Sequence, residues 1–537
     1  MKTNHVVGFF LLIFFSFLFL TCGPSPEPFD LVIKNGYILD GCGNPPYRED
    51  IGIRGKKIAQ IGSISESKAE KVIDAHNLTV TPGFIDVHTH CDRGIDEIPT
   101  VDNYLLQGVT TVIGGNCGGH PFPLKSLFQK LENKGISLNF ACLIGHNTIR
   151  REVMGLKKTL PTTEEMKEMK KLIHQEMKAG AVGFSTGLSY LPGSYSNKEE
   201  IVELASAVAP YNGIYASHIR NQGDHITRAV KEAIQVGEKN DIPVQISHIK
   251  LAKDSVWGEI ERVTKPVEEA RERGVNVLLD QYPYTATSSG FTSSFPSWVF
   301  EGGRDKFLQR MEDEETYQKV KSYVIERRLA STKGIDKTET IYISRYKENP
   351  EYEGKNLKEI LVERGQKPNV SNAADLIIEI QKKGGASGVF FQMDEKDVQD
   401  LMKLPYIMHA SDGSVQEKGE GVPHPRNYGT FPRVISHYVR EEGVLPLREA
   451  IRKMTSLPAQ AFRLSGRGIL KEGMYADLTI FDRDVFKDQA TFSKPHQYAE
   501  GLAYVVVNGE VVVKNNQHTG SRPGMILYGP AKGRSNH

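Results

Sequence analysis

Short apolar runs alternate with amphipathic stretches through the central part of the chain, between Pro82 and Arg463. The amphipathic stretches, such as EEMKEMKKLIHQEMKAG and HITRAVKEAIQVGEK, carry apolar residues at helical spacing. Eight apolar runs have the length of buried strands: GFIDVH, VTTVIGG, LNFACLIG, AVGFSTG, GIYASH, PVQISH, VNVLLD and YIMHAS. Strands that alternate with helices indicate βα units and a parallel sheet. The pattern therefore predicts an α/β protein whose main domain, residues 82–463, is a (β/α)8 barrel like that of TIM, enlarged by insertions.

The last two apolar runs, VNVLLD and YIMHAS, are much farther apart than the others. A single βα unit needs far fewer residues than separate these two runs. We therefore expect about residues 284–404 to form an insertion that serves as part of a lid over the barrel.

Both ends of the chain have the alternating pattern of antiparallel strands. LVIKNGYILD and DIGIRGKKIAQIG precede the barrel, and GMYADLTIFD and YVVVNGEVVVKN follow it. The dipeptides Asn35-Gly36 and Asn508-Gly509 mark matching turns in the two ends. We expect residues 29–81 and 464–537 to form one small β-sandwich around the inserted barrel.

Residues 1–28 differ from the rest of the chain. An apolar run from Val6 to Leu20 is as long as the core of a signal peptide and short for a membrane span, and Cys22 follows it closely. This arrangement resembles a bacterial lipoprotein signal in which Cys22 is lipidated, although no small residue precedes that cysteine. An uncleaved anchor and an ordinary signal peptide are the alternatives. We expect export to the bacterial cell envelope, with the membrane contacted only through this segment.

Charge and cysteine content exclude some function classes. The 67 Lys and Arg residues balance 66 Asp and Glu residues, and no basic stripe is present, so no nucleic-acid partner is expected. Apart from Cys22, the cysteines are Cys42, Cys91, Cys117 and Cys142. Four scattered cysteines in a chain of 537 residues are not a disulfide framework.

Candidate metal ligands gather where the predicted strands end, which is where such barrels place their active sites. The first run ends in Asp86-Val87-His88-Thr89-His90, and strand alternation puts His88 and His90 on the same side. Four further candidates each end another run: Cys117, His218, His248 and Asp412. One histidine or cysteine alone is more often structural, but this whole set indicates a metal site. Imidazole and thiolate favour Zn²⁺ over Mg²⁺ or Ca²⁺.

The motifs at these positions resemble those of the N-acyl-D-amino-acid deacylases (D-aminoacylases) of the amidohydrolase superfamily. They are GFIDVHTH, QGVTTVIGGNCG, YASHIRN, QISHIK, DQYPYTA, ASDG and HPRNYGTFPR, in a likeness that runs from about residue 29 to 524. The resemblance implies one tight zinc site made by Cys117, His218 and His248. It also implies a second, weaker position at His88 and His90, and a catalytic carboxylate at Asp412.

The resemblance also implies residues that hold a small N-acyl amino acid substrate. Lys250, Tyr284 and Arg426 match positions that bind its free α-carboxylate, and Tyr190 is a further candidate. Arg426 has a structural alternative, a salt bridge that fixes its loop. His146 ends the third strand and is a candidate partner of the acyl oxygen or, equally, a structural residue.

Other residues near the motifs are interpreted as structural. Cys91 follows His90, where the family usually has an acidic residue, and alternation turns it away from the metal. We expect a buried thiol rather than a ligand, and a disulfide is the other alternative. His120, His409 and His424 are expected to be structural.

These residues predict hydrolysis of an N-acyl-D-amino acid to a carboxylate and a free D-amino acid, with Asp412 as general base and acid. One alternative is an amidohydrolase acting on another amide, such as a cyclic imide (dihydroorotase- or hydantoinase-like) or a dipeptide. Cyclic-amide branches use a carboxylated lysine on the fourth strand, and the corresponding segment here, GFSTG, has no lysine. The other alternative is a lipid-anchored binding protein with an inactive site.

Overall fold

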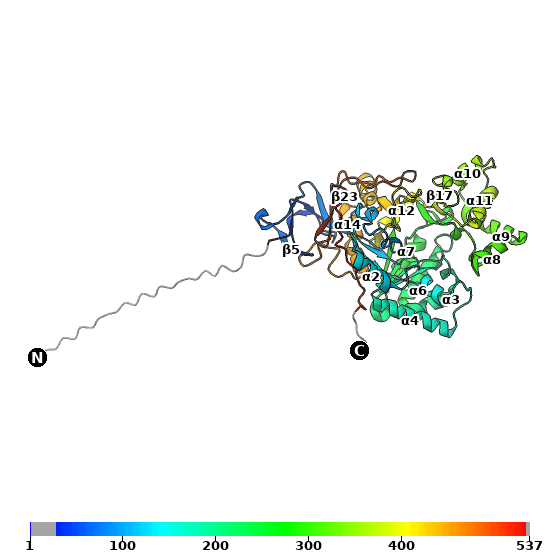
Figure 1. Ribbon diagram of the computed structural model, residues 1–537, viewed down its shortest axis with the longest axis horizontal. Coiled ribbons are helices and arrows are strands. Elements are labelled where there is room, and N and C mark those ends of the chain that lie inside the picture. Colours follow the sequence, from blue (N-terminus) through cyan, green and yellow to red (C-terminus); the bar gives the residue numbers. More distant parts are fainter. Residues whose placement is uncertain (2–27, 533–537) are drawn as a thin grey trace.

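The structure is a computed structural model that describes Met1 and residues 28–532 (Figure 1). The apolar run from Val6 to Leu20 and the expected lipidation site Cys22 lie outside the described residues. Across the described part of the chain, no helix combines the length and apolar character that a bilayer crossing requires.

Each of the eight apolar runs contains a strand, as predicted. The strands are β8 (Phe84–Asp86), β9 (Val109–Gly114), β10 (Asn139–Cys142) continued by β11 (Ile144–Gly145), β12 (Gly183–Gly187), β13 (Ile214–His218), β14 (Val244–Ile246), β15 (Val277–Gln281) and β19 (Ile407–His409). They pair in parallel in the orders β8-β9-β10 and β11-β12-β13-β14-β15-β19. All their carboxyl ends therefore face the same way.

Backbone hydrogen bonds join the segments that follow the first and the last of these strands. The Asp412 amide donates to the His88 carbonyl across 2.8 Å, and the His90 amide donates to the Gly413 carbonyl across 2.7 Å. The buried Asp86 carboxylate adds a bond, because it accepts from the Ser411 amide at 3.0 Å. Residues more than 300 positions apart in the chain are thus held side by side at the carboxyl ends of the strands.

Helices alternate with the strands and pack against them. They are α1 (Asp102–Leu105), α2 (Leu124–Lys134), α3 (His146–Met154), α4 (Thr163–Ala179), α5 (Lys198–Ala205), α6 (Ile226–Asn240), α7 (Glu261–Glu272), α13 (Arg426–Arg433), α14 (Leu447–Met454) and α15 (Ser456–Ala461). α4 begins at a capping box in which Thr162 accepts from the Glu165 amide. α6 buries Val230, Ala233 and Ile234 along one face. This apolar face is what the helical spacing of the sequence predicts.

The two chain ends form two sheets beside the barrel strands, and the larger sheet contains strands from both ends. One sheet has the order β5-β4-β1-β6 and the other β23-β22-β21-β20-β7-β2-β3. Their bounds are β1 (Leu31–Lys34), β2 (Tyr37–Ile38), β3 (Tyr47–Arg48), β4 (Asp50–Arg54), β5 (Lys57–Gly62), β6 (Val72–Asp74), β7 (Thr79–Pro82), β20 (Leu478–Phe481), β21 (Leu502–Val507), β22 (Glu510–Lys514) and β23 (Gln517–His518). Val80 from the first end and Ile480 from the second pack in one apolar core. β5 and β23 accordingly lie in the same half of the molecule (Figure 1).

The segment between β15 and β19, where an insertion is expected, forms a separate layer. It contains β16 (Ala286–Gly290), α8 (Arg304–Arg310), α9 (Glu314–Val324), the π-helical turn η7 (Ile325–Leu329), β17 (Ile341–Arg345), α10 (Leu357–Glu363), α11 (Val370–Lys382) and β18 (Ser387–Phe391). The helix that follows, α12 (Glu395–Met402), instead packs Val398 and Leu401 into the barrel core. The strands of the separate layer form an antiparallel sheet, β16-β18-β17. Phe291, Phe307 and Phe390 belong to an apolar core distinct from that of the barrel. α8 to α11 occupy the end of the molecule opposite to β5 (Figure 1).

Candidate metal centre and active site

Cys117, His218 and His248 converge from three strand ends. Cys117 follows β9, His218 is the last residue of β13, and His248 follows β14. The Cys117 sulfur lies 3.6 Å from Nδ1 of His218 and 3.5 Å from Nε2 of His248. The ligand set expected for the tight site is therefore assembled around one point.

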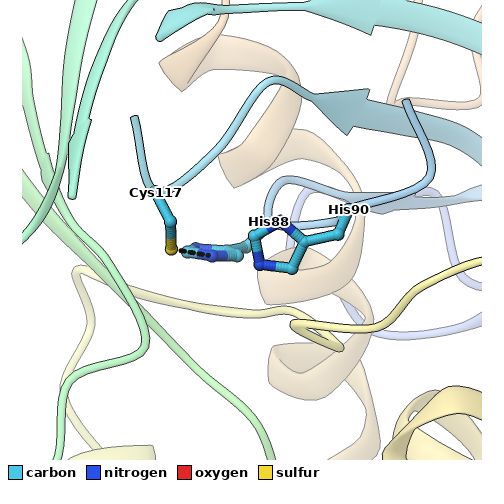
Figure 2. A group of neighbouring side chains, drawn as sticks. All are labelled: His88, His90 and Cys117. Carbon is cyan, nitrogen blue, oxygen red and sulfur yellow. Dashed lines mark hydrogen bonds between the residues drawn. The ribbon is translucent and has the colours of Figure 1, made fainter. Parts of the chain in front are cut away.

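His88 and His90, which follow β8, form a second group that shares Cys117. Figure 2 shows the Cys117 side chain pointing at His88, whose Nε2 lies 3.3 Å from the sulfur. A third group joins His88 and His248 to Asp412, and the ligand atoms within each group lie within 4.8 Å of one another. The two expected metal positions are therefore adjacent and share a thiolate.

The spacing of these atoms fits zinc. Tetrahedral zinc has Zn–S bonds of about 2.3 Å and Zn–N bonds of about 2.0–2.1 Å, which puts a sulfur and a nitrogen ligand about 3.5 Å apart. The three sulfur–nitrogen distances at Cys117 are 3.3, 3.6 and 3.5 Å. The donors are imidazoles and a thiolate, which zinc prefers to hard oxygen ligands.

Neighbouring groups orient the imidazoles of the cluster. Nε2 of His218 lies 2.7 Å from the Ser189 hydroxyl, which leaves Nδ1 facing Cys117. Nδ1 of His88 lies 3.4 Å from the carboxylate of Asp280, which leaves Nε2 facing Cys117. The same carboxylate accepts the backbone amide of His248 at 2.8 Å. Such outer contacts fix the ring orientation of metal-binding histidines.

Three residues of this cluster have left-handed backbone conformations. The φ angles are 53° at Cys117, 36° at His248 and 51° at Asp412. Residues other than glycine adopt this conformation at an energetic cost, and such residues concentrate at functional sites. Each of the three lies two or three residues beyond the end of a barrel strand, so the turned backbone directs its side chain toward the common centre.

The electrostatics of the cluster favour the ligand and base forms. Burial by itself would raise the pKa of Cys117, but the surrounding histidines, His88 and His248 foremost, hold it well below its usual value. Burial likewise opposes ionisation of Asp412, but the charge of Arg426 and the neighbouring histidines hold its pKa well below the usual range. Cys117 is thus poised as a thiolate and Asp412 as a carboxylate.

Asp412 lies between the metal ligands and a cation. Its Oδ1 is 3.1 Å from Nε2 of His90, and its Oδ2 is 2.8 Å from Nη1 of Arg426. The salt bridge considered for Arg426 is therefore present, and its partner is the candidate catalytic carboxylate. The Arg426 guanidinium also lies 4.9 Å from the ring centre of Tyr282.

A cavity of about 250 Å³ opens on this cluster. Barrel residues that line it include Tyr190, His218, His248, Lys250, Tyr282 and Asp412. The ring of Tyr190 lies 4.5 Å from that of His218, centre to centre. Burial lowers the pKa of Lys250 to about 7, although the charge of Asp412 opposes this shift. Two of the expected substrate residues, Tyr190 and Lys250, therefore line the same cavity as two metal ligands and the candidate base.

His146 is not part of the cavity, so its expected contact with an acyl oxygen is wrong. It begins α3, is fully buried, and places Nε2 2.9 Å from the carboxylate of Glu200. Arg150 contacts the same carboxylate at 3.0 Å. The helix turns the side chain away from the metal cluster into this internal network, so His146 has the structural role that was its alternative.

Tyr284 is also misplaced by the sequence interpretation. Its buried ring packs against His424 and under the Arg433 guanidinium, and it does not line the cavity. Tyr282, two residues earlier, lines the cavity, and its buried hydroxyl makes no hydrogen bond among the described residues. The resemblance pointed to the Tyr-Pro-Tyr motif, but only the fold distinguishes its two tyrosines.

The residues expected to be structural contact protein groups. Cys91 is a buried free thiol that accepts a hydrogen bond from the Thr89 hydroxyl at 2.9 Å. His120 accepts from the Gly145 amide, His424 lies 2.9 Å from the Ala286 carbonyl, and His409 is fully buried. A cavity residue that sequence analysis missed is Arg328, from η7 of the insertion.

Comparison with known proteins agrees with this site. A profile described as the Amidohydrolase family matches residues 71–330 and 359–513. A D-aminoacylase of Alcaligenes xylosoxydans xylosoxydans is 36% identical over 524 residues, which cover 93% of this chain and 98% of that protein. An N-acyl-D-glutamate deacylase of the same organism is 34% identical over 523 residues, which cover 93% and 97%.

Solved structures give the same grouping. The crystal structure of a D-aminoacylase described as defining a novel subset of amidohydrolases matches with a TM-score of 0.80 at 34% identity, covering 93% of this chain and all of that one. An N-acyl-D-glutamate deacylase from Bordetella bronchiseptica, complexed with zinc and a phosphonate inhibitor, matches with a TM-score of 0.80 at 32% identity, covering 94% and 100%. The chain therefore belongs to the amidohydrolase family and, within it, to the group of the D-aminoacylases.

Proposed function

We propose that this protein is a zinc-dependent hydrolase that cleaves the amide bond of N-acyl-D-amino acids. One observation carries the proposal: His218 and His248, which converge with Cys117 on one point, line a cavity together with Asp412 and the cationic Lys250. The names of the relatives, D-aminoacylase and N-acyl-D-glutamate deacylase, support the same substrate class.

The chain supplies a base beside the metal ligands. When bound there, zinc supplies Lewis-acid chemistry that makes water nucleophilic near neutral pH and polarises a carbonyl. Asp412 accepts the proton of the attacking water, because its carboxylate is ionised and lies at the metal ligands. It then delivers that proton to the departing nitrogen, since an unprotonated amide anion is a poor leaving group.

Lys250, Tyr282 and Arg426 form a cluster suited to the α-carboxylate of the substrate. The Lys250 ammonium lies 5.3 Å and the Arg426 guanidinium 4.9 Å from the ring centre of Tyr282. The Tyr282 hydroxyl has no hydrogen-bond partner among the described residues, so it can donate to a bound carboxylate. We propose this cluster in place of one that contains Tyr284.

This arrangement fixes the hand of the substrate. The carboxylate cluster holds one substituent of the chiral carbon, and the metal ligands face the acyl carbonyl on another. The side chain can then enter the cavity in one configuration only, and its mirror image meets the wall. We therefore expect kcat/KM of the zinc-loaded enzyme to favour N-acetyl-D-amino acids over their L enantiomers by on the order of 100-fold, the loss expected from a misplacement of about 1 Å at a reacting centre.

The same assay tests the carboxylate cluster through the two tyrosines of the motif. Tyr282→Phe should raise KM for the D substrates by about 10- to 100-fold, because a hydrogen bond to a charged group contributes about 1.5–3 kcal/mol. Tyr284→Phe is the matched control and should leave KM unchanged, since Tyr284 lies outside the cavity. Equal rates on D and L enantiomers would contradict the proposed function, and equal effects of the two variants would contradict the role of Tyr282.

A second proposal concerns the location of the protein. We propose that it is exported and anchored in the bacterial cell envelope through a lipid on Cys22. The apolar run from Val6 to Leu20 and the cysteine that closely follows it support this proposal. We propose this segment alone as the part of the protein that contacts the membrane.

Cells fed a tagged fatty acid should label the wild-type protein but not Cys22→Ser, because the thiol is the attachment point. Cys42→Ser is the control, since Cys42 is a free and exposed cysteine that should not carry the lipid. Gel fluorescence of the immunoprecipitated protein measures the label. Absence of label on the wild type, or label that survives in Cys22→Ser, would overturn the assignment.

A further inference from the structure

The cavity has two walls of different origin. The ends of the barrel strands supply the metal ligands and the carboxylate cluster, and the insertion supplies the opposite wall. On the insertion side the wall consists mainly of hydroxyl and amide side chains together with cationic groups, and it includes Ser288, Ser289, Ser293, Arg328 and Gln392. The proposed reaction gives no role to a cation in this wall.

Arg328 is held in this wall by neutral groups. It lies on η7, directly after α9, and α9 lies at the end of the molecule opposite to β5 (Figure 1). Its Nε donates to the Ser294 hydroxyl at 3.0 Å, Nη2 donates to the Ser293 hydroxyl at 2.7 Å, and Nη1 donates to the side-chain oxygen Oε1 of Gln392 at 3.3 Å. The Phe390 ring supports the guanidinium at 4.3 Å. The guanidinium is thus fixed at the cavity surface.

The charge of Arg328 has no counterion in the described part of the chain. No carboxylate there lies within 4 Å of its nitrogens. Three acids line the same cavity. Asp224 pairs with Lys253 at 2.6 Å, Asp412 contacts Arg426, and Glu326, on the same turn, makes no ion pair with Arg328. Burial, together with the neighbouring Arg327, lowers the pKa of Arg328 to about 9. A half-buried cation that contacts only neutral acceptors is not accounted for by the fold.

The Arg328 guanidinium also has N–H donors that are free to bind a ligand. Arginine has five N–H donors in a planar fork, and three hydrogen bonds to side chains leave part of that fork free. The planar fork matches a carboxylate in a bidentate pair. The α-carboxylate of the substrate is already assigned to the cluster at Tyr282, on the barrel side of the cavity.

We infer that Arg328 binds a second carboxylate of the substrate. This inference rests on the proposed function and narrows it to N-acyl-D-amino acids that carry an additional acid group. That group belongs either to the side chain, as in an N-acyl derivative of D-glutamate or D-aspartate, or to the acyl part, as in an N-succinyl derivative. Tyr190 lines the same cavity as Tyr282 and Arg328. Its position is consistent with one substrate that reaches both groups.

The test compares substrates that differ by one charge. N-acetyl-D-glutamate is paired with N-acetyl-D-glutamine for the side-chain source, and N-succinyl-D-leucine with N-succinamoyl-D-leucine for the acyl source. The wild-type, zinc-loaded enzyme should favour the acid of one pair by about 10- to 100-fold in kcat/KM, the scale of one hydrogen bond to a charged group. The pair that shows this preference identifies which carboxylate Arg328 binds.

Arg328→Gln should abolish that preference and leave kcat/KM for the neutral member of the pair unchanged. Arg304→Gln is the matched control, because Arg304 is an exposed arginine on α8 of the same insertion and does not line the cavity. A wild-type enzyme that prefers the acid in neither pair would overturn the inference, and so would an Arg328→Gln variant whose kcat/KM falls equally for the acid and the amide. In both cases hydrolysis of the amides would still uphold the proposed function. Failure of the wild type to hydrolyse any of the D substrates would overturn both.

Discussion

Replacing Cys117 with alanine should yield a protein that retains no tightly bound zinc and does not hydrolyse N-acyl-D-amino acids. The sulfur lies within 3.6 Å of ring nitrogens of His88, His218 and His248, so it is the atom that both ligand groups share. Without it, each group keeps only its histidines, and the softest donor is lost. Metal content by mass spectrometry, measured after dialysis, and turnover of N-acetyl-D-leucine check the result.

A matched control separates metal loss from a general effect of removing a thiol. Cys91→Ala deletes the thiol of a buried free cysteine nearby, which accepts a hydrogen bond from the Thr89 hydroxyl, and this variant should keep zinc and turnover. Thermal unfolding of both variants shows whether the fold survives. Alanine at position 117 adopts the left-handed backbone no less easily than cysteine, so the fold should persist. A Cys117→Ala protein with full metal content and near-normal rate would contradict the ligand assignment.

Much of this site can be predicted from sequence because two simple rules apply together. Parallel strands in an α/β barrel all end at one face, and alternation decides which side chains at a strand end point inward. These rules placed Cys117, His218 and His248 in one candidate set with other strand-end residues. The family resemblance then singled out these three, and the structure brings them to one point. The turned backbone at Cys117 and His248 was not predictable, because a left-handed φ in a residue other than glycine has no pattern in the sequence.

The misplaced residues have a different physical cause. His146 also follows a strand, but it is the first residue of α3, and the helix directs its ring to Glu200, 54 positions later. Tyr282 and Tyr284 flank a proline in one motif, and nothing local decides which faces the cavity. In each case the answer depends on a partner far away in the chain, which periodicity does not encode.

Arg328 illustrates the same limit for the insertion. It lies on a π-helical turn between a helix and a loop, and its contacts come from Ser293, Ser294 and Gln392, 34 to 64 positions away. The distance between the last two apolar runs predicts an insertion, which has a core of its own, but it does not predict which face of the insertion meets the cavity. The part of the site that selects the substrate is therefore the part that the sequence leaves least determined.

Asp412→Asn should lower kcat by about 10²- to 10⁴-fold, the range expected when one acid–base group is removed. Asparagine keeps the shape of the side chain but cannot accept the proton of water. Loss of the Asp412 carboxylate also frees Arg426, whose Nη1 lies 2.8 Å from that carboxylate. An effect on substrate binding therefore has to be separated from an effect on proton transfer. KM and metal content serve that purpose, and both should change little. A variant that has merely lost its metal would instead make Asp412 a ligand.

An ester substrate distinguishes the two halves of the proton transfer. In an O-acyl analogue of the substrate, oxygen replaces the departing nitrogen, and an alkoxide leaves with less need of protonation than an amide anion. If Asp412 both accepts the proton of water and returns it to the leaving group, Asp412→Asn should slow amide hydrolysis more than ester hydrolysis. If it only accepts the proton, the two substrates should lose equally. Because Asp412 contacts both His90 and Arg426, it is the group of this chain placed to carry a proton from the metal side to the substrate side of the cavity.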